Sequence, residues 1–190
     1  MTPHYGLLDD ESVGRISVCL PEARILYLLR DPRLRAWSNA WAWLTKQDRA
    51  PGELNLPHRW ADGDKGDADL DLDAVIDALS TPATRAQGEY APVIRRWRDH
   101  FGGALLLLRT DDIAREPRDL IARCYRHLGV DAELAATLDD HDLEAWVNPH
   151  RPAPPSVPER VRAVLDETFA KAIADTATET GWDVSSWQTW

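Results

Sequence analysis

A five-residue apolar run, Ile25–Leu29, is the feature that most restricts how this chain can fold. The run shows little alternation of polar and apolar residues, which is typical of a strand that is buried on both faces, as strands of parallel sheets are. A second apolar run, Ala104–Leu108, has the same character. We therefore expect an α/β fold with few parallel strands, at about residues 24–29 and 104–109, surrounded mostly by α-helices.

The residues that come after the first run are those of an anion site. Arg30 ends the strand, and Asp31-Pro32 predicts a helix start with a capping carboxylate and a proline at the first helical position. Ser38 falls within the first two turns of this helix. The backbone amides, the helix dipole and an arginine fork together attract a phosphate. The alternative is that Arg30 pairs with Asp31 or a neighbouring carboxylate, and that Ser38 is simply a small helix residue.

The string R-D-P-x-x-R-A-W-S, from Arg30 to Ser38, resembles the 3′-phosphate-binding segment of the sulfotransferase family. Those enzymes use 3′-phosphoadenosine 5′-phosphosulfate (PAPS) as sulfuryl donor. The resemblance implies a fold like that of the P-loop NTPases, with Arg30 and Ser38 holding the 3′-phosphate. Later segments resemble the family as well: G-x-Y at 88–90, W-x-x-x-F at 97–101 and H-L-G-V at 127–130.

A proline-bearing loop, at about residues 139–155, corresponds in position to a family loop that folds over the donor nucleotide. That loop commonly carries basic residues, so the resemblance makes His150 and Arg151 candidates for binding the cofactor. The alternative is an exposed loop that contacts no ligand.

One family element has no counterpart in the sequence. A sulfotransferase begins with a strand and a phosphate-cradling loop of the P-K-[SA]-G-T-[ST] kind, and the resemblance therefore implies a fold truncated at the N-terminus. The family's general base normally lies in the same part, so no catalytic residue is assigned here. Without that strand, the strand at 24–29 becomes a sheet edge, which we expect either a second copy in a homodimer or a missing N-terminal segment to cover.

Charge and composition exclude several classes of partner. The net charge of −10 argues against nucleic acid, and no apolar run is long enough to span a membrane, so we expect a cytoplasmic protein. Cys19 and Cys124 each fall within an expected helix without a local partner, and we interpret both as small buried apolar residues in a reducing compartment.

The 190 residues suit one domain, 1–190, with an acidic loop insertion at about 48–70. Six aspartates between Asp62 and Asp73 raise the possibility of calcium binding, but no frame matches an EF-hand loop, so we expect no metal and a solvated loop.

Helical periodicity predicts four further helices. They are expected at about 11–20, 70–79, 90–101 and 117–128, the last with Leu120, Ile121, Cys124 and Leu128 facing inward. A long helix then begins at a capping box, Ser156–Glu159, and ends at Gly181, with Val161, Leu165, Phe169 and Ile173 as its inward stripe. The tryptophan-rich tail after Gly181 is expected to pack back on the body.

Together, these patterns predict transfer of a sulfuryl group from PAPS to a hydroxyl or amine of a small-molecule or glycan acceptor. The alternative is a non-catalytic relative, or a fragment, that keeps the 3′-phosphate half-site as a nucleotide-binding or partner module.

Overall fold

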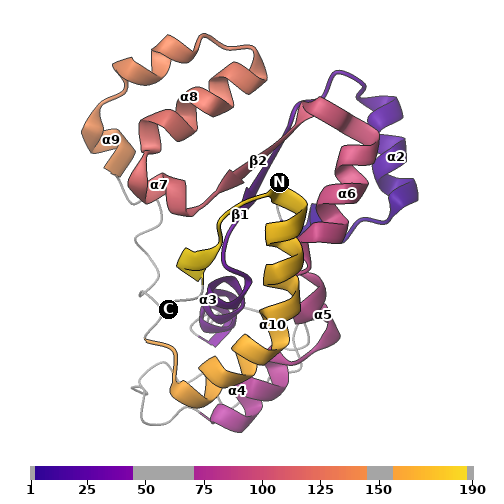
Figure 1. The fold of residues 1–190 in the computed structure, drawn as a ribbon, viewed down its shortest axis with the longest axis vertical. Helices are drawn as coiled ribbons and strands as arrows, with labels where there is room; N and C mark the ends of the chain where they lie inside the picture. The colour runs from indigo at the N-terminus through magenta and orange to yellow at the C-terminus, as the bar shows by residue number, and fades with distance from the viewer. Residues whose placement is uncertain (1–2, 45–70, 145–155, 188–190) are drawn as a thin grey trace. The chain divides into compact units, whose positions relative to one another are not determined.

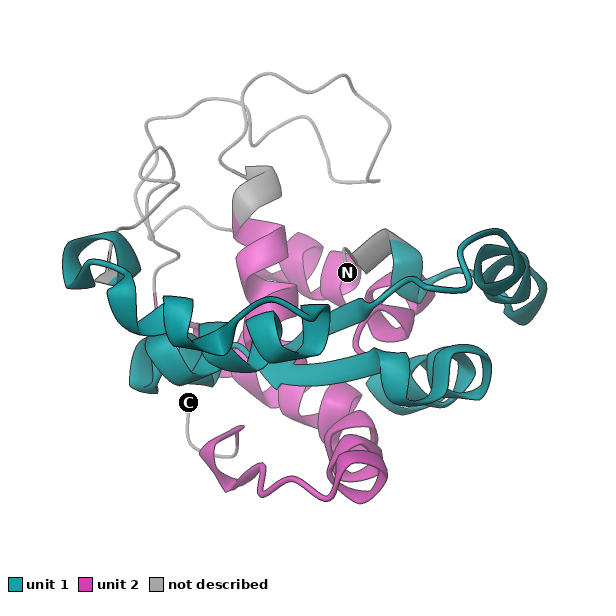
Figure 2. Cartoon of the chain, turned by 90° about the horizontal axis from the view of Figure 1, so that it is seen from above, with its two compact units in different colours: residues 1–30, 90–147 teal, residues 31–89, 148–190 magenta. Residues whose placement is uncertain are grey.

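The structure is a computed structural model that describes residues 3–44, 71–144 and 156–187. These residues fall into two compact units, coloured separately in Figure 2. Unit 1 holds Met1–Arg30 and Tyr90–Val147, and unit 2 holds Asp31–Glu89 and Asn148–Trp190. The expectation of one domain over 1–190 stays a prediction. The predicted acidic insertion at about 48–70 lies outside the described residues.

Unit 1 contains a two-stranded parallel sheet made of β1 (Ile25–Leu29) and β2 (Leu105–Arg109), which lie side by side in Figure 1. Ile25 pairs with Leu105, and the register continues until Leu29 pairs with Arg109. Beyond the last pair, the amide of Thr110 donates to the carbonyl of Leu29 at 2.8 Å. This confirms both predicted strands and their parallel direction. The expectation that a second copy or a preceding segment covers an edge of β1 stays a prediction.

The helices before and after β1 in unit 1 form around apolar side chains. After the short α1 (Pro3–Gly6), α2 (Asp10–Cys19) packs against α6 (Tyr90–Phe101). The helix α6 buries one apolar face, because Tyr90, Ile94, Trp97 and Phe101 are all buried. Tyr27 of β1 meets Tyr90 edge to face, with ring centroids 6.1 Å apart. The 3₁₀ turn η3 (Gly102–Ala104) then leads from α6 into β2.

After β2, unit 1 continues through α7 (Asp111–Arg115), α8 (Pro117–Leu128), the 3₁₀ segment η4 (Ala132–Thr137) and α9 (Asp140–Glu144). Gly129 closes α8 in the left-handed conformation, with φ 76°, which glycine adopts without steric cost. The inward stripe of α8 is only partly confirmed: Leu120 is buried, but Leu128 is 45% exposed. Leu128 is the last residue of the helix, so no further helical turn covers it.

Unit 2 is built from α3 (Pro32–Leu44), α4 (Leu72–Leu79), α5 (Pro82–Ala86), α10 (Glu159–Thr180) and the 3₁₀ turn η5 (Ser185–Trp187). The helices α3 and α4 pack on each other and on α10. The expected stripe of α10 is confirmed, because Val161, Leu165, Phe169 and Ile173 are buried. Trp37 of α3 is also buried and stacks on Trp41 at 6.4 Å.

The predicted capping box at Ser156–Glu159 is wrong. Pro158 has extended backbone angles, φ −58° and ψ 141°, and caps α10 itself without a side-chain hydrogen bond. Helical geometry therefore begins at Glu159, and Ser156 lies too far from the helix to cap it. The far end behaves as expected: Gly181 closes the helix with φ 70°, and Trp187 of the tail is buried.

The two cysteines differ from the expectation. Both are free thiols, but Cys19 is exposed and Cys124 is half-buried. Cys19 is the last residue of α2, where the helix ends and the next residues, Leu20 and Pro21, are exposed as well. Within the described parts of the chain, no helix has the length and the apolar character needed to cross a membrane.

Candidate functional site

The carboxyl end of β1 carries Arg30, the last residue of the N-terminal segment of unit 1. Ligands of open α/β sheets bind beyond the carboxyl ends of the strands, so this is a suitable place for a binding residue. Arg30 is partly exposed, and it has no hydrogen bond or ion pair with any residue that the structure describes. Among the described residues, none occupies the guanidinium group of Arg30, so it is available to bind a ligand.

The first turn of α3 begins unit 2 as the sequence predicts. Pro32 is its first residue, and the carboxylate of Asp31 accepts a hydrogen bond from the amide of Arg33 at 2.9 Å. The same carboxylate is held by the Arg33 guanidinium: Nε lies 3.1 Å from Oδ1 and Nη2 lies 2.8 Å from Oδ2. Asp31 is thus both a helix cap and one half of a buried ion pair, and its charge is already paired by Arg33.

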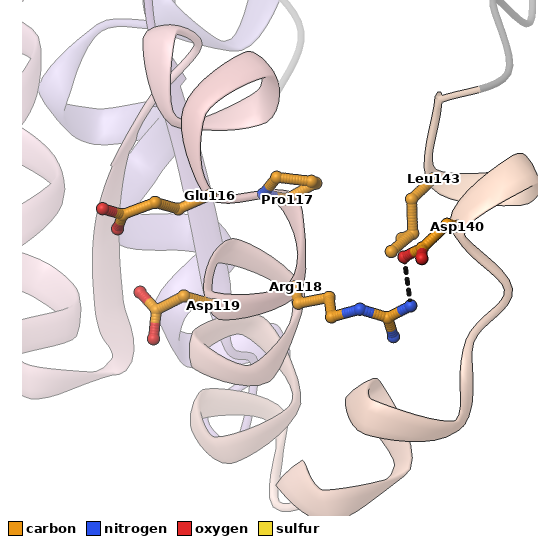
Figure 3. A pocket seen from close by; sticks show the side chains of 6 residues that line it. All are labelled: Glu116, Pro117, Arg118, Asp119, Asp140 and Leu143. Atoms are coloured by element: carbon orange, nitrogen blue, oxygen red, sulfur yellow. Dashed lines mark hydrogen bonds and ion pairs between the residues drawn. The ribbon is translucent and has the colours of Figure 1, made fainter.

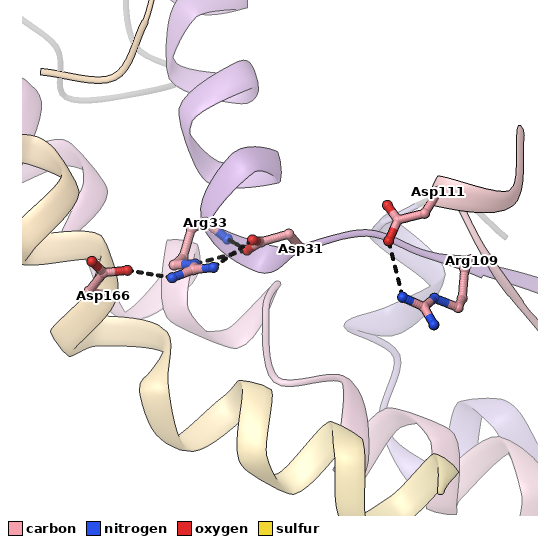
Figure 4. A network of polar contacts seen from close by, with 5 residues as sticks. All are labelled: Asp31, Arg33, Arg109, Asp111 and Asp166. Carbon is pink, nitrogen blue, oxygen red and sulfur yellow. Dashed lines mark hydrogen bonds and ion pairs between the residues drawn. The ribbon is translucent and has the colours of Figure 1, made fainter. Parts of the chain in front are cut away.

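The other arginines near Arg30 are bound within unit 2. Figure 4 shows Arg33 between Asp31 and Asp166 of α10, whose Oδ1 accepts from Nη1 at 2.5 Å. Arg35 donates from Nη1 to Oε1 of Gln87 at 2.8 Å. Of the three arginines between 30 and 35, the described contacts therefore leave Arg30 as the one without a protein acceptor.

Ser38 lies on α3, half-buried, and no described residue shares a hydrogen bond with its hydroxyl. Because Ser38 belongs to unit 2 and Arg30 to unit 1, the expectation that both hold one phosphate stays a prediction. The other two candidates, His150 and Arg151, lie outside the described residues.

Two acids after β2 have structural partners in unit 1. Asp111 accepts from Nη2 of Arg109 at 3.2 Å, and Asp112 accepts from Nη1 of Arg123 at 3.2 Å. These ion pairs link the end of β2 and α7 to α8. These ion pairs give both aspartates a structural role, which does not require a bound ligand.

A separate open pocket of about 420 Å³ lies at the beginning of α8 and beside α9, in unit 1 (Figure 3). Its lining residues are Glu116, Pro117, Arg118, Asp119, Asp140 and Leu143. Arg118 is bound to Asp140 across the pocket at 2.5 Å, which leaves an acidic surplus there. A carboxylate-rich pocket repels a phosphate, so this pocket is a poor site for an anionic nucleotide.

Sequence reasoning missed the connection from Arg33 to Asp166. These residues are 133 positions apart, and no local pattern relates an acid in the middle of one helix to an arginine at the start of another. The aspartates between Asp62 and Asp73, which raised the possibility of calcium, fall mostly outside the described residues. Among the residues that are described, no group of three potential ligands is placed to hold a metal ion.

Comparison with known proteins shows a likeness of fold at low sequence identity. No protein-family model matches the chain, and no curated protein matches it by sequence. The structure resembles the crystal structure of a sulfotransferase from Alicyclobacillus acidocaldarius, with a TM-score of 0.60 and 22% sequence identity. The likeness covers 94% of this chain and 63% of the bacterial one, so this chain spans less than two thirds of its neighbour's length. The described chain therefore has a mixed α/β fold, mostly helical around two parallel strands, like that of a sulfotransferase.

Proposed function

We propose that this protein is a sulfotransferase-like enzyme that transfers a sulfuryl group from PAPS to a hydroxyl or amine of a small molecule or glycan. The observation that carries the proposal is the fold shared with a sulfotransferase over 94% of the chain. The R-D-P-x-x-R-A-W-S segment supports it, because the chain passes through this segment from β1 into α3.

The proposed ligands of the 3′-phosphate are Arg30 and Ser38. They suit that group chemically, because an arginine forks onto phosphate oxygens and a serine hydroxyl donates one further hydrogen bond. Arg33 and Arg35 are already bound to protein acceptors, which makes Arg30 the stronger candidate among its neighbours. His150 and Arg151 are proposed as further contacts to the nucleotide.

When bound, the donor would supply an activated sulfuryl group for in-line displacement at sulfur. As in phosphoryl transfer, positioning and stabilisation of charge would provide most of the rate. Arg30 and Ser38 would orient the donor through its 3′-phosphate, at a distance from the reacting atoms.

A non-catalytic nucleotide-binding module is the second candidate. The observation that favours it concerns the phosphate-cradling loop, in which the sulfotransferase family has a lysine near a glycine. The one glycine-lysine cluster in this sequence is Gly63-Asp64-Lys65-Gly66, and its aspartate would repel a phosphate. Both candidates require the same half-site, so binding and transfer must be measured separately.

The first test is calorimetric titration of the chain with adenosine 3′,5′-bisphosphate. Arg30→Ala should weaken binding about 10- to 100-fold, the range expected for losing charge-assisted hydrogen bonds. Arg24→Ala is the matched control, because Arg24 lies exposed just before the opposite end of β1 and should leave the affinity unchanged.

Three outcomes separate the possibilities. Loss of binding in Arg30→Ala alone supports the half-site, and incubation with PAPS and a panel of acceptors then distinguishes an enzyme from a binding module. Equal loss in Arg30→Ala and Arg24→Ala indicates unspecific charge attraction. A folded wild-type chain that does not bind the bisphosphate contradicts the proposed function.

A further inference from the structure

The first turn of α3 is fixed to the rest of unit 2 by an ionic network that includes Asp31, Arg33 and Asp166. Arg33 binds Asp31 with Nε and Nη2 and binds Asp166 of α10 with Nη1, so each of its three guanidinium nitrogens has an acceptor (Figure 4). Asp31 in turn uses both carboxylate oxygens and also caps the helix. The network thereby joins the beginning of α3 to the middle of α10.

The two residues at the centre of this network, Asp31 and Arg33, are buried, which restricts the positions that their side chains can take. Asp31 is 2% exposed and Arg33 is 5% exposed. A buried ion pair contributes little net stability, because desolvation offsets the attraction, but breaking it on one side is costly. Its value is therefore in orientation: two carboxylates hold the planar guanidinium, and with it the first turn of α3, in a single position.

Apolar and polar contacts hold the same turn from other sides. Cβ of Pro32 lies 3.0 Å from the position that a Cβ on Gly88 would take, beside the ring of Phe169. Arg35, one turn of helix after Asp31, reaches Gln87 and the carbonyl of Thr84. These contacts come from residues far from α3 in the sequence, so the helix start is located by the tertiary structure of unit 2.

We propose that Asp31, Arg33 and Asp166 are positioning residues for the 3′-phosphate of the nucleotide, an inference that rests on the proposed function. They fix the helix that carries Ser38, which lies six residues, or about 9 Å of helix, beyond Pro32. Arg33 also neutralises the Asp31 carboxylate, whose charge would otherwise oppose an anion at this helix end. None of the three needs to touch the ligand.

Asp166→Asn separates positioning from simple electrostatics. Removing a negative charge strengthens anion binding if only the field matters, whereas loosening Arg33 weakens it if position matters. Asp166 is half-exposed, so its substitution leaves the buried Asp31–Arg33 pair in place and should not prevent folding. The control is Glu167→Gln, which removes the same charge from the next, exposed position of α10.

The experiment compares adenosine 3′,5′-bisphosphate with adenosine 5′-monophosphate, which lacks the 3′-phosphate, on each protein. Asp166→Asn should lower the affinity for the bisphosphate about 3- to 10-fold, the range expected for one partly exposed charged hydrogen bond. The affinity for the monophosphate should stay unchanged. Asp166→Glu should restore part of the loss, and Glu167→Gln should bind both nucleotides as the wild type does.

Hydrogen exchange of the unliganded chain gives a second measurement that needs no nucleotide. The amides of Leu34, Arg35 and Ala36 should exchange faster in Asp166→Asn than in Glu167→Gln, because the charged hydrogen bond from Arg33 to α10 becomes a weaker neutral one and holds the start of α3 less firmly. Unchanged exchange at these amides overturns the attachment and with it the inference.

The binding outcomes distinguish this inference from the proposed function. A wild-type chain that binds neither nucleotide contradicts both. A wild-type chain that prefers the bisphosphate, with the same preference in Asp166→Asn, overturns the positioning role alone. Tighter binding of the bisphosphate by Asp166→Asn also overturns it, because the field of the carboxylate would then outweigh its contact with Arg33.

Discussion

Gly88 lies so close to Phe169 that a Cβ added to Gly88 would stand 2.4 Å from Cε1 and 2.8 Å from Cδ1 of the phenyl ring. Phe169 is buried on α10 and cannot turn away without disturbing the core of unit 2. Gly88→Ala should therefore destabilise the protein by about 1–3 kcal/mol, the usual cost of overpacking. Urea unfolding monitored by tryptophan fluorescence measures this change.

Gly103→Ala is the control for that measurement. Gly103 lies in η3, and no neighbouring atom falls within 4 Å of the Cβ that alanine would add. The change in unfolding free energy should stay within about 0.5 kcal/mol. A comparable loss in both variants would contradict the assignment of the effect at Gly88 to the contact with Phe169.

Acid should loosen the start of α2. Asp9 caps this helix by accepting from the amide of Ser12 at 2.8 Å, and the hydrogen bonds from Ser12, side chain and then backbone, lower the pKa of the Asp9 carboxyl. Because the folded-state pKa is depressed, the cap contributes above the unfolded-state pKa of about 4 and is lost as pH falls through the lower folded value. The Ser12 amide resonance, monitored by NMR from pH 6 to pH 2, should shift in that acidic range.

Asp9→Asn separates the charge from the hydrogen bond. Asparagine is an equally good N-cap acceptor but does not titrate here, so the acid-dependent shift of the Ser12 amide should disappear while α2 still forms. A shift of the same size in the variant would show that Asp9 is not the group whose titration moves the Ser12 amide.

The parts of the fold that depend on long apolar patterns could be predicted from the sequence. Ile25–Leu29 and the run at 104–109 are apolar enough to predict two strands of a parallel sheet, and they pair in parallel. The expected burial on both faces is wrong at Leu28, which is 38% exposed. The stripe of α10 was likewise predictable, because Leu165 and Phe169 repeat at the spacing of one helix face and both are buried. In each case many side chains favour the same arrangement, so one exception changes little.

Helix ends were less predictable, because single residues determine them. Leu128 and Cys19 continue the pattern of their helices but are the final residues of α8 and α2, where burial depends on the path of the chain beyond the helix. The Ser156–Glu159 motif contains Pro158, whose extended backbone moves the helix start to Glu159. Local spacing does not contain this information.

The candidate site divides in the same way. Asp31 as a helix cap could be predicted from the Asp-Pro dipeptide, and the structure confirms it. The alternative interpretation of Arg30 paired it with Asp31, but in the structure Asp31 binds Arg33. Arg33 also binds a second acid, Asp166. That contact depends on how α10 packs on α3, which only the three-dimensional structure provides.

The two free thiols should react at different rates. Cys19 is exposed at the end of α2, whereas burial raises the pKa of the half-buried Cys124 thiol. Since the thiolate is the reactive form, iodoacetamide at pH 8 should modify Cys19 first, and labelling of Cys124 should rise only at higher pH. Mass spectrometry of peptides at timed intervals measures both rates, with Cys19→Ser as the control. Equal rates at pH 8 would contradict the difference in environment.

The tail after α10 should be a stabilising part of unit 2. Trp187 lies in η5 and is 2% exposed, and its amide donates to the carbonyl of Val184 at 2.9 Å. Truncating a buried tryptophan removes a large apolar side chain and leaves a cavity, so Trp187→Ala should cost about 3–5 kcal/mol in unfolding free energy. Ser185→Ala, at an exposed position of the same turn, should change it by less than about 0.5 kcal/mol. Thermal and urea unfolding of the two variants provide the comparison. A small loss for Trp187→Ala would mean that the tail only covers the core without supporting it, and the cooperative unit would then end at Gly181.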